Sequence, residues 1–190
     1  GDGALQARLD ALLTTLHGEG LLLGAQLCVQ ELSTGATLAE CALGHRSWRD
    51  PLPVERDTPF NLTELSKLFV AASVLRLVDA GRLRLAQRVT AHGATLEQVL
   101  AHTSGHVELL SRAVNSFIDL CDTPTMAKLE AKTSPLVPPG VRQQYHHTSY
   151  GWLLAHACTL AGTDLEAAWR KLADAALGPG GHRRLALRLP

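Results

Sequence analysis

The sequence is poor in aromatic residues, in net charge and in long apolar runs, and each shortage excludes a class of function. Aromatic residues make up only 4% of the 190 residues, too few for stacking platforms that bind nucleic-acid bases. Eighteen Lys and Arg balance eighteen Asp and Glu, so no overall field favours nucleic acid or an anionic membrane. No apolar run approaches the roughly 20 residues that span a bilayer. Hydrophobic residues nevertheless make up 46%, enough for the core of about one domain.

The chain also lacks a paired cysteine motif. Its cysteines are far apart and form no C-x-x-C pair: Cys28, Cys41, Cys121 and Cys158. Apolar neighbours favour buried free thiols. A disulfide between Cys28 and Cys41 is the alternative, if the two lie on neighbouring strands.

The nine histidines do not predict a metal site. His146 and His147 are adjacent, so their side chains should point apart in a strand or turn. His102 and His106 are separated by Thr103-Ser104-Gly105, which should break any helix that would align them. We expect His102 to cap or brace that turn, and we expect no metal or other cofactor.

Apolar periodicity predicts a helix, a β-hairpin and then only helices. The expected helices cover residues 5–16, 64–80, 95–102, 109–122, 125–132, 150–160 and 165–176, and the expected strands cover 24–32 and 36–43. This order divides the chain into a helix and hairpin at 1–45, a helical region at 46–178 and a tail at 179–190. A two-stranded sheet is marginal by itself, so we expect the hairpin to pair with other polypeptide.

The helix expected at 64–80 carries the strongest apolar pattern. One stripe should face the core: Leu65, Leu68, Phe69, Ala72, Leu75 and Val78. Thr63 is the expected N-cap, and Gly81 should end the helix.

Five segments, in order and at sensible spacing, carry a family resemblance. They are Pro51-Leu52-Pro53-Val54, Asp57-Thr58-Pro59-Phe60, residues 75–85, residues 95–105, and Pro139-Gly140 leading to Tyr145 and Tyr150-Gly151. Through them the chain resembles the N-terminal half of class C-type β-lactamases and their relatives, the penicillin-binding proteins, esterases and eukaryotic β-lactamase-like proteins. The resemblance runs from about residue 24 to 178. It implies an α+β fold, mainly α here, with the later sheet strands missing.

The same resemblance locates a catalytic motif that this chain does not keep. In the family, a serine of an S-x-x-K motif attacks a carbonyl, and the lysine and a tyrosine of Y-x-N accept protons. Lys67 and Tyr145 match the lysine and the tyrosine, whereas Glu64 stands at the serine position and His147 at the asparagine position. The third motif, Lys- or His-Thr-Gly, is absent. No residue is therefore assigned a catalytic role, and these four are remnant positions of the family motifs.

Glu64 has a simple structural interpretation. In the first turn of a helix it interacts favourably with the helix dipole and can pair with Lys67 at i+3, at the mouth of a remnant cleft near Tyr145. The alternative is a general base for metal-free hydrolysis. Ser66 and Thr63 are poor substitutes for the nucleophile, because neither has the family's spacing to Lys67. His147 is expected to line the cleft.

Two functions follow from the resemblance and the departures. The first is a catalytically inactive β-lactamase-like protein that acts as a structural or binding subunit of an assembly. The alternative is a serine-type hydrolase of which this chain is only the N-terminal part. The expected partners are other subunits, or the missing C-terminal half, packed on the hairpin of residues 25–43. Analogy with the eukaryotic relatives implies an organellar, mitochondrial location.

Overall fold

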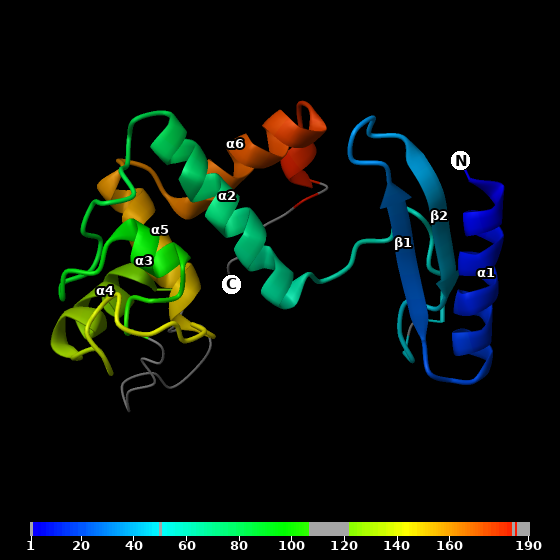
Figure 1. The fold of residues 1–190 in the computed structure, drawn as a ribbon, viewed down its shortest axis with the longest axis horizontal. Coiled ribbons are helices and arrows are strands. Elements are labelled where there is room, and N and C mark those ends of the chain that lie inside the picture. The colour runs from blue at the N-terminus through cyan, green and yellow to red at the C-terminus, as the bar shows by residue number, and fades with distance from the viewer. Residues whose placement is uncertain (1, 50, 107–121, 184, 186–190) are drawn as a thin grey trace. The chain divides into compact units, whose positions relative to one another are not determined.

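A computed structural model of the chain describes residues 2–49, 51–106, 122–183 and 185. These residues form two compact units, Gly1–Asn61 and Leu62–Pro190 (Figure 1). Within the described part of the chain, no helix has both the length and the apolar character needed to cross a membrane. The fold is mainly helical with one two-stranded sheet, as the sequence predicts.

The first unit consists of helix α1 (Gly3–Gly18) and the antiparallel strands β1 (Gly24–Gln30) and β2 (Thr37–Gly44) (Figure 1). Asp2 caps α1 by accepting hydrogen bonds from the backbone N–H groups of Ala4 and Leu5. The strand register pairs Leu27 with Cys41, and a bulge interrupts it near the turn. The predicted helix and hairpin are confirmed.

Helix α1 covers the outer edge of β2. The backbone N–H of Asp2 donates to the carbonyl of Leu38 at 2.9 Å. The side-chain amide of Gln6 accepts from the N–H of Glu40 at 3.0 Å and donates to its carbonyl at 3.2 Å. Since Glu40 directs its backbone groups away from β1, its partner Cys28 directs its own away from β2. Among the described residues, the hairpin edge that α1 does not cover is therefore that of β1.

The structure corrects the prediction that Cys28 is buried and excludes a disulfide between Cys28 and Cys41. Cys41 and Cys158 are buried, but Cys28 is exposed, because it lies on the solvent side of β1. Leu27, not Cys28, pairs with Cys41, so adjacent Cys28 points to the opposite face and no disulfide forms. The Cys41 thiol instead donates to Oδ1 of Asp10 at 2.9 Å. Cys121 lies outside the described residues.

The second unit is helical. Its elements are the 3₁₀ turn η1 (Thr63–Leu65), the helices α2 (Ser66–Asp79), α3 (Leu96–Leu100), α4 (Thr123–Lys132), α5 (Ser149–Leu160) and α6 (Leu165–Leu177), and the 3₁₀ turn η3 (Gly181–Arg183). The helix expected at 109–122 falls outside the described residues, except for Asp122, which caps α4. Thr95 caps α3 in a capping box with Gln98.

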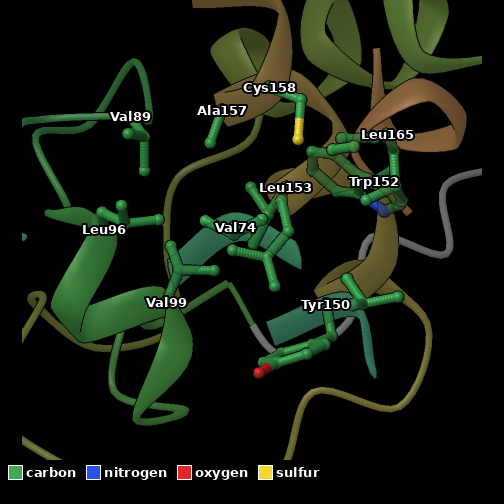
Figure 2. Close-up of a cluster of buried hydrophobic side chains, with 14 of the residues drawn as sticks. Val74, Val89, Leu96, Val99, Tyr150, Trp152, Leu153, Ala157, Cys158 and Leu165 are labelled. Carbon is green, nitrogen blue, oxygen red and sulfur yellow. The ribbon is translucent and has the colours of Figure 1, made fainter. Parts of the chain in front are cut away.

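Helix α5 lies at the centre of the core of this unit and is buried along most of its length. Side chains from α2, α3 and α6 pack around it (Figure 2). The cluster includes Val70, Val74, Leu77, Leu96, Val99, Trp152, Leu153, Leu154, Leu165 and Trp169. This core fixes the position of α2, whose first turn carries the remnant motif.

The face that α2 turns to the core differs from the predicted one. Leu65, Leu68 and Leu75 are exposed at 58%, 67% and 41%. The buried residues of α2 are Val70, Ser73, Val74 and Leu77. The prediction is confirmed for Phe69 and Val78, which pack against the core, and is wrong for the three leucines. Helix α2 is apolar on both sides, so periodicity alone does not choose between them.

Thr63 is not the N-cap that its position suggests. It lies inside η1 with φ of 44°, and the residue that caps α2 is Leu65, which makes no side-chain capping bond. The carbonyl of Thr63 accepts a 2.5 Å hydrogen bond from the hydroxyl of Ser66. The chain enters α2 through a tight 3₁₀ turn, and this moves the start of the helix past Thr63.

Candidate functional site

The site lies at the beginning of α2, where η1 and the first helical turn bring Glu64 and Lys67 together. The ammonium of Lys67 and the carboxylate of Glu64 form an ion pair. The Lys67 side chain is only 16% exposed, whereas that of Glu64 is 60% exposed. The predicted ion pair at i,i+3 is confirmed.

Lys67 has an acceptor for each of its ammonium hydrogens. Besides the carboxylate of Glu64, Nζ donates to the hydroxyl of Tyr145 at 2.9 Å and to the backbone carbonyl of His147 at 2.9 Å. Nζ also lies 4.3 Å from the centroid of the Tyr145 ring. A lysine ammonium has three N–H donors, so every donor of Lys67 has a hydrogen-bond acceptor.

The hydroxyl of Tyr145 completes a closed triangle with Glu64 and Lys67. It accepts from Lys67 and donates to the same oxygen of Glu64 that the ammonium contacts. The hydrogen bond from Lys67, and after it the one from Tyr145, lower the pKa of Glu64. The carboxylate is therefore ionised at neutral pH. Lys67 and Tyr145, which match the proton acceptors of the family motif, both donate hydrogen bonds to it.

Two histidine rings hold Tyr145 in this position. The ring of His147 meets it edge to face with centroids 4.7 Å apart, and the ring of His102 lies 4.8 Å away. His102 also stacks on Tyr150 at 4.6 Å. His147 itself is exposed, and its carbonyl rather than its ring binds Lys67. The expectation that His147 lines a cleft stays a prediction.

His102 braces a different segment from the one predicted. Nδ1 of the His102 ring accepts a hydrogen bond from the backbone N–H of His146 at 3.1 Å. The backbone carbonyl of His102 accepts one from the backbone N–H of Gln144 at 2.9 Å. His102 adopts φ of 60°, a conformation that is uncommon outside glycine but that histidine and asparagine adopt more often than most residues. It thus ties the end of α3 to the segment that carries Tyr145.

Behind the triangle lies a buried polar cluster that sequence reasoning did not identify. Ser104 and His146 are both completely buried, and Ser104 Oγ lies 2.6 Å from Nε2 of His146. His106 and Glu130 are 2% and 4% exposed. The one signal in the sequence was that Ser104 and His146 lie within the family segments 95–105 and 139–151, and that His106 directly follows the first of them.

His106 and Glu130 lie side by side in this cluster. His106 Nε2 is 3.3 Å from Oε1 of Glu130, whose carboxylate accepts from the backbone N–H of Ala91 at 3.1 Å. Burial lowers the pKa of His106 to about 4, so the ring is neutral at pH 7 and the contact is not an ion pair there. Among the described residues, no group of three or more His, Cys, Asp or Glu side chains could hold a metal ion.

The chemistry that this site offers is limited by its hydroxyl groups. The Ser66 hydroxyl donates to the carbonyl of Thr63, within its own turn. In the part of the chain that the structure describes, the hydroxyl that Lys67 contacts is the phenol of Tyr145. The position of the family's nucleophile is occupied by Glu64. Its carboxylate accepts hydrogen bonds from Lys67 and Tyr145, the two groups that would activate a serine there.

Comparisons with known proteins agree with the geometry. The family model described as Beta-lactamase matches residues 9–172, which extends the predicted resemblance toward the N-terminus. "Esterase EstB" of Burkholderia gladioli is 35% identical over 116 residues, which cover 54% of this chain and 29% of the relative. "Penicillin-binding protein 4" of Amycolatopsis lactamdurans is 32% identical over 113 residues, which cover 53% of this chain and 28% of the relative.

The solved structures show the same fold. A class C beta-lactamase superposes with a TM-score of 0.76 over 95% of this chain and 50% of its own, at 20% sequence identity. The chain therefore spans less than a third of the curated relatives and about half of this structure.

Proposed function

The chain belongs to the beta-lactamase family, which includes esterases and penicillin-binding proteins, and from this premise we propose that it does not carry out the acyl transfer of that family. In this proposal it acts as a structural or binding subunit of a larger assembly. The observation that carries the proposal is the closed triangle of Glu64, Lys67 and Tyr145. A carboxylate occupies the nucleophile position, and both residues that would accept a proton from a serine are bound to it.

The charge state of the triangle supports the absence of acyl transfer. An amine must have a free lone pair to accept a proton, whereas Nζ of Lys67 donates hydrogen bonds to Glu64, Tyr145 and the carbonyl of His147. A carboxylate that attacked an ester or a lactam would at best form a labile anhydride. Since the lowered pKa of Glu64 also makes it a weaker base, a Glu64-based hydrolysis has little support.

The hairpin supports the role as a subunit. Helix α1 hydrogen-bonds to backbone groups on the outer edge of β2. The backbone groups of Cys28 point outward on the opposite edge of the hairpin, that of β1. Open edges of this kind are usually covered or paired. We propose that other polypeptide pairs with β1 by strand addition, burying more than about 1,000 Å² in total.

A second candidate function is a serine-type hydrolase of which this chain is one part. It is favoured by the fraction of each relative that the chain covers, 29% of the esterase and 28% of the penicillin-binding protein. The remaining part of such a protein would supply the third family motif. This reading accounts for the coverage, but it leaves Glu64 at the nucleophile position unexplained.

Intact-mass spectrometry after incubation with a penicillin or a fluorophosphonate tests the absence of an acyl-enzyme. We expect no stable adduct on the full chain. A Glu64→Ser variant restores the spacing of the S-x-x-K motif and is the matched control for the nucleophile position; it should also remain unlabelled, because this chain carries no third motif. A stable adduct on any of residues 63–67 of the unmodified chain would contradict the proposal and favour the hydrolase.

Hydrogen exchange combined with size-exclusion chromatography tests the role as a subunit. We expect the amides on the outer edge of β1 to exchange rapidly in the isolated chain and to become protected in a complex. The amides that link β1 to β2 serve as the internal control. If the isolated chain is a compact monomer with strong protection throughout β1, the sheet is self-sufficient and the proposal loses its physical basis.

A further inference from the structure

The hydrogen bonds around His102 and His146 leave each ring with a single tautomer. The backbone N–H of His146 donates to Nδ1 of His102, so this nitrogen is bare and the proton of the His102 ring sits on Nε2. In His146, Nδ1 lies 2.6 Å from the carbonyl oxygen of Gln144, which can only accept. His146 therefore carries its proton on Nδ1.

The same logic continues through Ser104. Since Nε2 of His146 is bare, it accepts from the Ser104 hydroxyl at 2.6 Å. The Ser104 oxygen in turn accepts from the backbone N–H of His106 at 3.2 Å. Every bond in this chain has one donor and one acceptor, and it is complete only while His102 and His146 are both neutral.

We propose that His102 and His146 form a proton-sensitive latch that holds Tyr145 on Glu64 and Lys67, and that protonation of His102 opens it. A charged imidazole carries a proton on both nitrogens. The new N–H on Nδ1 of His102 would point at the backbone N–H of His146, so a hydrogen bond becomes a contact between two donors. The segment that carries Tyr145 must then move away from His102.

The charged and titratable groups around His102 set the direction of the response. His146 and Tyr145 face it from the segment before α5, Tyr150 faces it from α5, and Glu64 and Lys67 act on it from the start of α2. Burial is the largest cause of its lowered pKa, followed by His146 and Lys67, while Glu64 opposes them. Together they lower the pKa of His102 from 6.5 to about 4.

The sign of the pH effect follows from this shift. A released His102 would bind a proton with a pKa near 6.5, whereas in the closed latch the pKa is about 4. The latch is therefore fully stable above about pH 6.5, weakens as the pH falls below that value, and has lost the contribution of His102 near pH 4. Opening would remove one hydrogen bond from Glu64 and one acceptor from Lys67. This inference goes beyond the proposed function and holds whether or not the chain is catalytic.

Fluorine NMR on the full chain labelled with 3-fluorotyrosine tests the latch, because the sequence contains only Tyr145 and Tyr150. We expect the Tyr145 resonance to move toward its unfolded position as the pH falls from about 7 to about 4, while circular dichroism shows that the helices persist. A Tyr145→Phe variant assigns the two resonances. If the Tyr145 resonance does not move while His102 becomes charged, the latch is refuted.

Nitrogen-15 NMR of the imidazole rings provides the second measurement on the unmodified sequence. We expect His102 as the Nε2–H tautomer and His146 as the Nδ1–H tautomer, both neutral at about pH 6. A titration midpoint of His102 near its ordinary 6.5, or the opposite tautomers, would overturn the proposal.

A His102→Asn variant removes the titrating ring, and asparagine tolerates the positive φ found there. We expect it to lose the part of the Tyr145 response that depends on His102. The matched control is His156→Gln, a histidine of the same unit on α5, which should leave the response unchanged. An equal response in both variants would place the proton-sensitive group elsewhere and contradict the proposal. The ring measurements on the unmodified chain decide the question if His102→Asn does not fold.

Discussion

The two units differ in how completely each buries its apolar residues. Unit 2 contains a continuous core around α5 (Figure 2). Val74, Leu154 and Cys158 in this core are completely buried. In unit 1 the buried apolar residues among those described are few: Leu13, Ala39, Cys41 and Val54. A helical unit can close its core with its own segments, whereas a two-stranded sheet with one helix leaves a face and an edge to be covered.

The difference indicates where association would matter most. Unit 2 has a continuous core, and Glu64, Lys67, Tyr145 and His147 of the remnant site all belong to it. Unit 1 has polar contacts between α1 and β2, such as the two bonds between Gln6 and Glu40, but a thin core. The following variants test this contrast directly.

Replacing a core leucine of unit 2 should have the largest effect. Leu154 on α5 is completely buried, so Leu154→Ala removes apolar contacts and leaves a cavity that the surrounding helices cannot fill. We expect unfolding of unit 2 to become easier by about 3 kcal/mol. Urea unfolding followed by the fluorescence of buried Trp152 and Trp169 measures it. Leu160→Ala, at a 48% exposed position on the same helix, is the control and should cost well under half as much.

The equivalent change in unit 1 should cost less. Leu13 is 7% exposed on α1, where the thin core has more freedom to relax around a smaller side chain. We expect Leu13→Ala to destabilise unit 1 by about 2 kcal/mol, the low end for a buried leucine. Hydrogen exchange of the amides that link β1 to β2 measures this change, with Leu12→Ala at a 52% exposed position of α1 as the control. A cost equal to that of Leu154→Ala would show that both units are packed alike.

Neutralising Glu64 should have the smallest effect on stability. Its carboxylate is 60% exposed, so its ion pair with Lys67 should contribute less than about 1 kcal/mol. Because the folded-state pKa of Glu64 is lowered, this contribution is present at neutral pH and is lost as the pH falls through that value. Thermal unfolding of Glu64→Gln at neutral pH measures it. Glu166→Gln, which breaks the exposed pair with Arg170 on α6, is the matched control, and a much larger cost at Glu64 would mean that the triangle also holds the fold.

The sequence was sufficient to predict the order of elements among the described residues and the pairing of Glu64 with Lys67. The spacing of apolar residues located the helices and the hairpin, and the i,i+3 spacing of Glu64 and Lys67 correctly predicted their ion pair. The placement of Tyr145 beside them followed from the family resemblance, because nothing local connects positions 78 residues apart.

The buried polar cluster could not be predicted in the same way. Ser104 and His146 are 42 residues apart, and each looks like a surface residue until its partner is known. The orientation of α2 was missed for a related reason: Leu65 and Leu68 satisfy the helical period as well as Val70 and Val74 do. Which apolar face is covered depends on α5 and α6, and this is decided by tertiary packing rather than by the local pattern.

The saturation of Lys67 has a consequence for chemical labelling of the protein. Amine-reactive reagents need an accessible lysine nitrogen, whereas that of Lys67 makes three hydrogen bonds on a side chain that is only 16% exposed. The other lysines of the chain are Lys128, Lys132 and Lys171. Mapping of acylated lysines would therefore find Lys67 unmodified while the site is intact. Lys67 should become acylated when its hydrogen bond to Glu64 or to Tyr145 is lost.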